Sequence, residues 1–301
     1  MGNLYTLAGS GRRPGILVVS GSDGGMPGAN AIPESFIAHL VENGFVVFAL
    51  AYFSYEELPE RLENIPLEYF ESALLWLRSC PEVDPARIGL VGQSRGGELS
   101  LLLGAKFPSL VQAIVACAPS GIAWGGFPYP NRLAWTLHNQ PVLPAVGALS
   151  GENDSITELN DLVWAMHTGR IPTHANDEHD PSHLTDLFEA RCHSPRAAAA
   201  EIPVENIQCP ILLLSGDKDA IWPAEFFCNS IMRRLRAHAF SFYMQHKNYE
   251  GAGHGIWSSR QGALYHPVGQ FWCQLGGTRE ASLSAHERSW ADVVKFLKES
   301  L

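Results

Sequence analysis

The sequence predicts an α/β fold with a mostly parallel central sheet, helices on both of its faces, and a lid insertion. Five continuous apolar runs occur at residues 15–20, 45–50, 88–91, 113–117 and 211–215. Strands of a parallel sheet that is covered on both faces have this composition. Segments with apolar residues at helical spacing separate the runs, as βαβ units require. The 301 residues, 46% of them hydrophobic, can bury a large core, and we expect residues 1–301 to form one domain.

The helices are expected where apolar residues recur every three or four positions. Pro66 and Pro223 stand where two of these helices begin, and proline is favoured at a helix start. A sixth strand is expected at residues 240–246. The predicted helices cover residues 35–43, 67–78, 98–106, 223–238 and 287–299.

The most informative motif is Gly92-Gln93-Ser94-Arg95-Gly96, which lies between the strand at residues 88–91 and the helix at residues 98–106. A serine between a strand and a helix occupies a sharp turn that lifts its hydroxyl clear of the backbone. The flanking glycines let the two elements cross closely. This arrangement is the nucleophile elbow of the α/β-hydrolase fold and predicts Ser94 as a nucleophile. The alternative is a glycine-rich turn with a bystander serine.

A serine hydroxyl needs a base, usually an imidazole that a carboxylate holds in the right tautomer. In this fold the chain order is Ser, acid, His. Asp217 and Asp219 both follow the strand at residues 211–215. We favour Asp219, because three residues past Gly216 the loop is long enough to turn the carboxylate toward the elbow; Asp217 would then cap the turn. His254, between two glycines after the last strand, is the expected base.

An oxyanion hole needs backbone N–H groups aimed at the developing negative charge. One donor should be the N–H of Arg95, and the other the N–H of Ser22 in the glycine-rich loop at residues 20–26. A plain glycine turn is the alternative for this loop. Three residues near the expected site are candidates for contacting the substrate: Asp23, Trp124 and Trp222.

Residues 121–204 interrupt the alternation of strands and helices and are rich in Trp, Pro and His. In this fold an insertion after the fourth parallel strand forms a lid over the strand ends. His179 and His183 have the spacing of a helical metal site, with His174 nearby, but Pro181 interrupts the span. We therefore expect neither a metal nor a cofactor.

The formal net charge of −10 and the pI near 5.6 argue against a nucleic-acid partner and against an anionic membrane surface. No run approaches the roughly 20 apolar residues of a membrane span, and the N-terminus lacks the basic region of a secretory signal. The six scattered cysteines favour reduced thiols and a cytoplasmic location. A basic patch of Arg233, Arg234 and Arg236, with Lys218, could contact coenzyme A; the alternative is a solvated helix face.

Five stretches resemble, in order, the acyl-coenzyme A thioesterase / bile acid-CoA:amino acid N-acyltransferase family. The resemblance covers most of residues 14–301 and implies its dienelactone-hydrolase-like α/β-hydrolase domain, with Ser94, Asp219 and His254 as the triad. The stretches are residues 48–59, 67–73, 88–101, 216–227 and 276–290.

The chain also departs from that family. Its animal members carry an N-terminal β-sandwich domain, for which this sequence has only a short segment before Pro14. Residues 121–204, which should form much of the pocket, match poorly, so the resemblance indicates least about the identity of the substrate. The amide-forming member has a cysteine at the position of Ser94, so the resemblance favours hydrolysis.

Three functions are therefore compared. The first is a thioesterase or esterase acting on a small-molecule acyl thioester or ester, in which an acyl group from coenzyme A or a carrier protein passes through Ser94. The second is an acyltransferase or cyclase, in which an amine or hydroxyl captures the same acyl-enzyme. The third is a binding protein that retains the fold without catalysis, which an intact Ser, Asp and His set disfavours.

Overall fold

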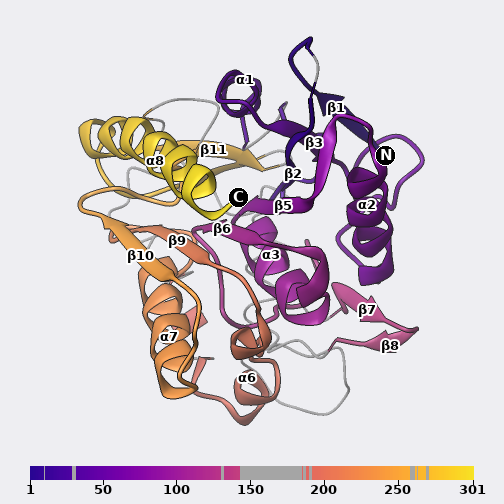
Figure 1. Ribbon diagram of the computed structural model, residues 1–301. Helices are drawn as coiled ribbons and strands as arrows, with labels where there is room; N and C mark the ends of the chain where they lie inside the picture. Colours follow the sequence, from indigo (N-terminus) through magenta and orange to yellow (C-terminus); the bar gives the residue numbers. More distant parts are fainter. Residues whose placement is uncertain are drawn as a thin grey trace.

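A seven-stranded sheet with the order β1-β3-β2-β5-β6-β9-β10 forms the centre of the protein (Figure 1). The computed structural model describes residues 1–9, 11–28, 32–129, 132–142, 185, 188–189, 192–257, 262, 264–268 and 271–301. Neighbouring strands are parallel except for β1, which pairs antiparallel with β3. The strands are β1 (Gly2–Tyr5), β2 (Arg13–Val19), β3 (Val46–Leu50), β5 (Val83–Gln93), β6 (Ala113–Cys117), β9 (Ile211–Gly216) and β10 (Met244–Tyr249).

Helices cover both faces of this sheet, as predicted. In β2, Leu17 and Val19 face one hydrophobic cluster while Ile16 and Val18 face the other, because successive side chains of a strand point to opposite faces. Helices α2, α3 and α7 pack on the first face, and α1 and α8 on the second (Figure 1). Their bounds are α1 (Glu34–Glu42), α2 (Leu67–Ser79), α3 (Arg95–Lys106), α7 (Ala224–Ala237) and α8 (Arg279–Ser300).

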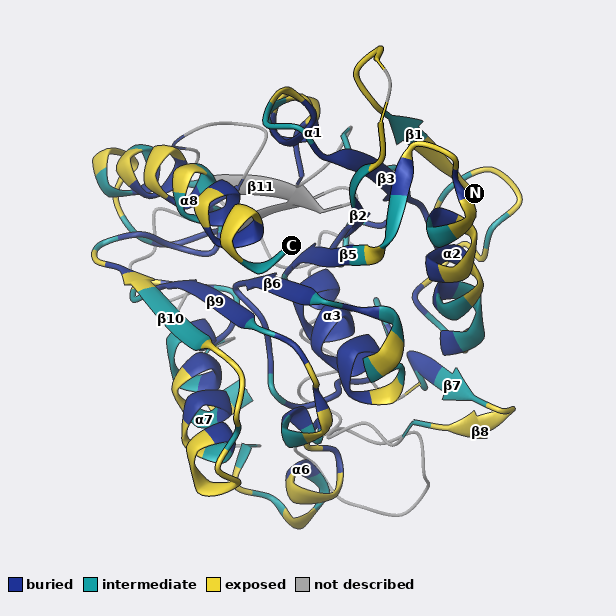
Figure 2. Ribbon diagram, in the orientation of Figure 1, coloured by how far each residue is buried: buried dark blue, intermediate teal, exposed yellow. Residues whose placement is uncertain are grey.

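Helix α3 is buried along nearly its whole length, and only Lys106 at its end is exposed (Figure 2). The neighbouring α2 has an exposed side with Leu75 and Trp76, which is normal for a surface helix. Because α3 begins directly after Ser94, the candidate nucleophile stands at the start of the most enclosed helix in the described part of the fold.

Several predicted boundaries were wrong by three residues or more. Strand β5 begins at Val83 and not at residue 88. The last strand begins at Met244 and not at residue 240, because the chain first ends α7 with a left-handed turn at Ala239 (φ 50°). Helix α8 begins at Arg279 and not at residue 287; the side chain of Thr278 accepts the N–H of Ala281 and caps it. The elbow helix begins at Arg95 and not at residue 98.

The segment that follows β6 and the segment that precedes β9 meet at their ends. Ile122 and Glu201 form an antiparallel bridge, the N–H of Ala123 donates to the carbonyl of Ala200 at 2.9 Å, and that of Ile202 donates to Gly121 at 2.9 Å. Much of the predicted lid at residues 121–204 lies outside the described residues. The lid and the single-domain organisation stay predictions.

Shorter elements complete the described structure. Strands β4, β7 and β8 form a small sheet, and β11 pairs with β12. No helix in the described ranges combines the length and the apolar content that a bilayer crossing needs. The shorter elements are β4 (Ile65–Pro66), β7 (Trp135–Leu137), β8 (Gln140–Pro141), α6 (Pro195–Ala199), β11 (Tyr265–Val268), β12 (Phe271–Gln274) and the 3₁₀ helices Pro108–Leu110 and Val204–Asn206.

A serine and a histidine pair across β9 and β10. The hydroxyl of Ser215 donates to the side-chain oxygen of Asn248 at 2.9 Å and lies 2.7 Å from Nε2 of His246. Nδ1 of the same ring lies 3.3 Å from the side-chain oxygen of Asn229, and the tautomer of the ring decides which nitrogen donates. Burial lowers the pKa of His246 from 6.5 to about 4, so the ring is neutral at pH 7 and the pair joins the edge strand to its neighbour.

We predict that His246 makes the fold sensitive to acid. Its pKa is lowered in the native state, so the stability it contributes is complete above about pH 6.5 and is lost as the pH falls toward 4. His246→Gln keeps a hydrogen-bonding side chain near Ser215 but does not titrate. Discounted for partial exposure to about 1 kcal/mol, the effect is a melting temperature that falls about 2–4 °C less in the variant between pH ~7.5 and pH ~4.5. An equal fall in both proteins would contradict this assignment.

Candidate active site

Ser94 occupies a strained turn between β5 and α3. Its backbone has φ 57° and ψ −121°, a region that costs a non-glycine residue about 1–3 kcal/mol. Its N–H donates to the carbonyl of Cys117 at the end of β6 at 2.8 Å, and its carbonyl accepts the N–H of Glu98 at 3.0 Å. These two hydrogen bonds hold the turn between the neighbouring strand and the helix that follows.

The two glycines of the motif are required by space. A Cβ atom on Gly92 would lie 2.1 Å from the carbonyl oxygen of Gly96, and one on Gly96 would lie 2.5 Å from the carbonyl oxygens of both Val19 and Ser20. All of these contacts are with backbone, which cannot move aside. The end of β2 therefore packs directly against the first turn of α3, as the elbow interpretation requires.

Asp219 contacts the imidazole of His254. Oδ2 of Asp219 lies 2.6 Å from Nδ1 of His254, and the two side chains are 2% and 9% exposed. Oδ1 of Asp219 accepts the N–H groups of Ile221 at 2.9 Å and Trp222 at 3.1 Å. One carboxylate oxygen is thus held by the loop and the other is aimed at the ring.

Asp217 has a different role. Its Oδ1 accepts the N–H of Gly251 at 2.6 Å, and its other oxygen lies 3.5 Å from Nζ of Lys218. It therefore joins the loop after β9 to the turn after β10. Of the two aspartates between which the sequence left a choice, Asp219 is the one that reaches His254.

The loop of His254 is tied to its surroundings through the backbone. The N–H of His254 donates to the carbonyl of Leu275 at 2.7 Å, and its carbonyl accepts Nε2 of Gln93 at 3.4 Å. Gln93 directly precedes Ser94, so the histidine loop and the elbow adjoin. Sequence reasoning missed this role of Gln93, since a polar residue inside the motif carries no pattern of its own.

Within the described residues, the Ser94 hydroxyl forms no hydrogen bond with His254. Gln93 contacts the backbone of His254, and Asp219 contacts its ring. These contacts bring Ser94 and the Asp219–His254 pair to one edge of the sheet, where the carboxyl ends of β5, β9 and β10 meet. Hydrogen bonds between a catalytic serine and its base are often long until the substrate is bound.

The predicted oxyanion donors also lie at this edge. Arg95 is the first residue of α3, and the first N–H groups of a helix have no acceptor within it. In the loop at residues 20–26, a Cβ atom on Gly21 would lie 3.6 Å from Oγ of Ser94. The half-buried Ser22 and Asp23 follow directly. The loop therefore passes beside the hydroxyl, and the donor role of Ser22 stays a prediction.

The side chain of Arg95 is buried and pairs with Glu98, which sequence reasoning missed. Nη1 of Arg95 lies 2.9 Å from Oε2 of Glu98, and the side chains are 6% and 0% exposed. Burial raises the pKa of Glu98 to about 7, against the opposing effect of the Arg95 guanidinium. An Arg-x-x-Glu pair in the first turn of an otherwise apolar helix was the available signal.

Trp124 and Trp222 belong to an aromatic cluster beside the histidine, which we define as Trp124, Phe188, Trp222 and Phe227. The ring of Trp222 lies edge-on to that of His254, with 6.0 Å between their centroids. Its Nε1 donates to the carbonyl of Ala118 at 3.0 Å. Both tryptophans are less than 5% exposed, so this cluster is packed.

The predicted basic patch is divided. The guanidinium of Arg234 donates to the carboxylates of Glu205 and Glu201, which neutralise it. Arg233, Arg236 and Lys218 are exposed. The described residues contain no group of three His, Cys, Asp or Glu placed to hold a metal ion, and His174, His179 and His183 lie outside them.

The cysteines do not supply a second nucleophile at this edge. Burial raises the pKa of the Cys117 thiol, which lies beside the elbow, and also that of Cys228. Both thiols therefore stay protonated at neutral pH. The cysteines described as free are Cys80, Cys117, Cys192, Cys209 and Cys228.

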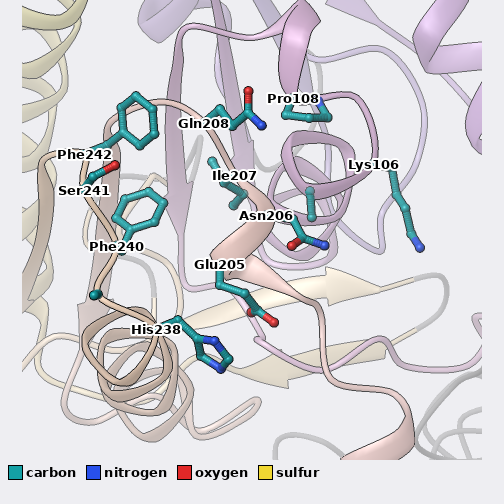
Figure 3. A pocket seen from close by; sticks show the side chains of 12 residues that line it. Lys106, Pro108, Glu205, Asn206, Ile207, Gln208, His238, Phe240, Ser241 and Phe242 are labelled. Atoms are coloured by element: carbon teal, nitrogen blue, oxygen red, sulfur yellow. The ribbon is translucent and has the colours of Figure 1, made fainter.

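An open depression of about 530 Å³ lies at the other end of α3 (Figure 3). Lys106 and Pro108 border it on one side, and His238, Phe240 and Phe242 on the other. Helix α3 rises about 1.5 Å per residue, so its 12 residues separate this depression from Ser94. It is therefore not part of the candidate site.

Comparison with known proteins identifies the family of the chain. Residues 65–301 match the family described as BAAT / acyl-CoA thioester hydrolase C terminal. Acyl-coenzyme A amino acid N-acyltransferase 2 of Mus musculus is 28% identical over 304 residues, covering 100% of this chain and 63% of that protein. Human mitochondrial acyl-coenzyme A thioesterase 2 is 30% identical over 237 residues, covering 79% of this chain and 41% of that protein. The chain thus spans less than two thirds of either relative.

Solved structures support the fold. The structure of DcsB with its substrate analogue has a TM-score of 0.60 at 13% identity, covering 99% of this chain and 93% of that one. A dienelactone hydrolase from Klebsiella pneumoniae has a TM-score of 0.52 at 15% identity, covering 97% and 89%. These similarities confirm the predicted α/β-hydrolase fold.

The packing of the elbow gives a first prediction for this site. Gly96→Ala should destabilise the protein by about 3 kcal/mol, because its Cβ meets only backbone, at the upper end of what overpacking costs. Gly104→Ala in the same helix is the matched control: its Cβ would meet the end of the flexible Ile114 side chain. Urea denaturation measures both. A smaller loss for Gly96→Ala than for Gly104→Ala would refute the steric account.

The two aspartates give a second prediction. Asp219→Asn should slow covalent labelling of Ser94 by a fluorophosphonate by about 10³- to 10⁴-fold, because the amide no longer favours the tautomer that accepts the serine proton. Asp217→Asn keeps the contact between Asp219 and His254 and should label at close to the wild-type rate. Labelling kinetics followed by intact-protein mass spectrometry separate the variants. If Asp217→Asn were the slow one, the choice of acid would be wrong.

Proposed function

The chain belongs to the BAAT/acyl-CoA thioester hydrolase C-terminal family, and from this premise we propose that it is a serine hydrolase of acyl thioesters. The observation that carries the proposal is the buried contact of 2.6 Å between Asp219 and His254, beside the strained turn that presents Ser94. A nucleophile, a base and an orienting carboxylate are the groups that acyl transfer requires. Acyl-CoA is the favoured substrate class because the human relative is an acyl-coenzyme A thioesterase.

In the proposed mechanism, Oγ of Ser94 attacks the acyl carbonyl while Nε2 of His254 takes the serine proton. Asp219 holds the Nδ1–H tautomer and stabilises the imidazolium that forms. The N–H groups of Arg95 and Ser22 donate hydrogen bonds to the carbonyl oxygen and stabilise the negative charge that develops on it. Collapse of this intermediate breaks the carbon–sulfur bond, and the thiol leaves with the proton from His254.

The second half of the reaction releases the acid. His254 takes a proton from a water molecule, whose oxygen attacks the acyl-enzyme and forms a second tetrahedral intermediate. Its collapse returns the proton to Ser94. Position 94 is a serine and not the cysteine of the family's amide-forming member, which supports hydrolysis over transfer to an amine. A coenzyme A leaving group would pass close to the half-buried Asp23 and the exposed Lys218, which lie in the loops after β2 and β9 at this edge of the sheet.

An acyltransferase is the second candidate. It is supported by the match to the mouse amino acid N-acyltransferase, which extends over 100% of this chain. An amine or hydroxyl would then replace water in the second half-reaction, and an acceptor within the acyl chain would give a cyclic product. Every catalytic residue is shared, so product analysis distinguishes the two.

We predict that Ser94→Ala abolishes turnover of acyl-CoA thioesters and leaves the fold intact, because the reaction loses its nucleophile while a smaller side chain is accommodated. Wild-type protein mixed with a thioester panel should gain the mass of one acyl group on Ser94, which peptide mass spectrometry locates. Parallel reactions with glycine and taurine separate free acid from amide product. Turnover by Ser94→Ala within a few-fold of wild type would exclude the proposed nucleophile.

A further inference from the structure

Arg95 and Glu98 form a buried ion pair in the first turn of α3, directly after Ser94. Their charged atoms are 2.9 Å apart, and the Glu98 side chain has no exposed surface. The guanidinium reaches the segment that follows β6. There, Nη2 of Arg95 donates to the carbonyls of Trp124 at 3.0 Å and Gly125 at 2.9 Å.

Glu98 holds the same segment from the other side. Its Oε1 accepts the N–H of Trp124 at 3.3 Å and Nε1 of Trp135, in β7, at 3.0 Å. The guanidinium of Arg95 also lies over the ring of Trp135, 5.8 Å from its centroid. One pair of side chains on the elbow helix therefore joins two separate parts of the chain between β6 and α6.

The energetics favour a positional role for the pair over a stabilising one. Removing two opposite charges from water is costly, and a well-packed apolar pair of similar volume is often equally or more stable. Here Nε of Arg95 and Oε2 of Glu98 are buried and form no hydrogen bond. Oε2 lies 2.9 Å from Nη1 of Arg95, so the two side chains interact mainly through their charges. The geometry, however, fixes the backbone of Trp124 and Gly125 through three hydrogen bonds.

We infer that Arg95 and Glu98 are positioning residues, a clamp that fixes Trp124 and Gly125 against the nucleophile elbow and thereby places one wall of the acyl site. Trp124 packs in the aromatic cluster, in which Trp222 contacts the ring of His254. The clamp thus ties the wall to the helix whose first N–H is the proposed oxyanion donor. The inference rests on the proposed function and names the residues that fix its selectivity for the acyl group.

The test separates positioning from stability with the double variant Arg95→Met/Glu98→Leu. It replaces the ion pair by apolar side chains of similar volume, which removes the cost of burying two charges but also removes the hydrogen bonds to Trp124, Gly125 and Trp135. The melting temperature of the variant is therefore measured first, and activity is compared at a temperature at which both proteins are folded. The kcat/KM of the double variant for a long-chain acyl-CoA should fall about 10- to 100-fold, because the wall is no longer fixed. Its kcat/KM for acetyl-CoA, whose short acyl group does not reach the wall, should fall by a smaller factor, so that the loss grows with the length of the acyl chain. If the folded double variant kept wild-type kcat/KM on the long chain, the clamp would be refuted.

Two further variants keep the test decisive if the double variant does not fold. Trp135→Phe keeps the aromatic ring and removes one donor to Glu98; it should raise KM for the long chain and speed hydrogen exchange in the peptide that contains Trp124. Wild-type exchange there would overturn the inference. Arg87→Gln is the matched control, because Arg87 and Asp84 form a pair with the same spacing, 2.7 Å apart, at the surface. It should leave exchange and turnover unchanged.

The outcomes also distinguish the inference from the proposed function. If the wild-type protein neither turned over acyl-CoA nor reacted with fluorophosphonate, the proposed function would fail. Hydrogen exchange at Trp124 would still report whether Arg95 and Glu98 hold the segment. If the wild type were active and Trp135→Phe exchanged like wild type, only the clamp would fail.

Discussion

The close approach of α3 to the ends of the parallel strands is the constraint on which the candidate site depends. The first turn of the helix lies so near the end of β2 that position 96 has no room for a Cβ atom. At this contact Ser94 has a positive φ of 57°, and the N–H of Arg95, the first of the helix, has no acceptor inside the helix. Helix α3 is buried along nearly its whole length. Glu98 on this helix has no access to solvent, and its carboxylate pairs with Arg95, one turn earlier in the same helix.

Much of the fold follows from the sequence because each central strand is buried on both faces. The continuous apolar runs identify β2, β3, β5, β6 and β9. Strand β1 was not predicted because it is a four-residue edge strand whose first two residues are exposed and which contains no apolar run. The start of α8 was missed because its first two turns bury Ser282 and His286 in place of an apolar stripe.

The candidate site was predictable to the extent that chain order and loop length determine it. The distance from Gly216 was enough to prefer Asp219 over Asp217, and Asp219 is the one in contact with His254. The partner of Arg95 was not predictable in this way. A glutamate in the first turn of a helix usually lies at the surface, where its negative charge interacts favourably with the helix dipole. Its burial depends on Trp135, which is 37 residues away in the chain. The Ser215–His246 pair also depends on a residue that is distant in the chain. The Ser215 hydroxyl lies 2.7 Å from Nε2 of His246. Nδ1 of that ring lies 3.3 Å from the amide oxygen of Asn229, whereas a catalytic triad has a carboxylate at this place.

The chain leaves the sheet after β6 and returns before β9 at one place, where residues 121–123 and 200–202 are hydrogen-bonded to each other. Arg95 binds the carbonyl of Trp124, directly after one side of this junction, and Arg234 binds the carboxylate of Glu201 on the other side; each arginine is on a helix that packs against the sheet. A segment whose two ends are joined and anchored can change in length or composition at little entropic cost to the frame. The segment between residues 123 and 200 can therefore diverge between related proteins and adapt one set of catalytic groups to different acyl donors, while the strands of the central sheet stay the same.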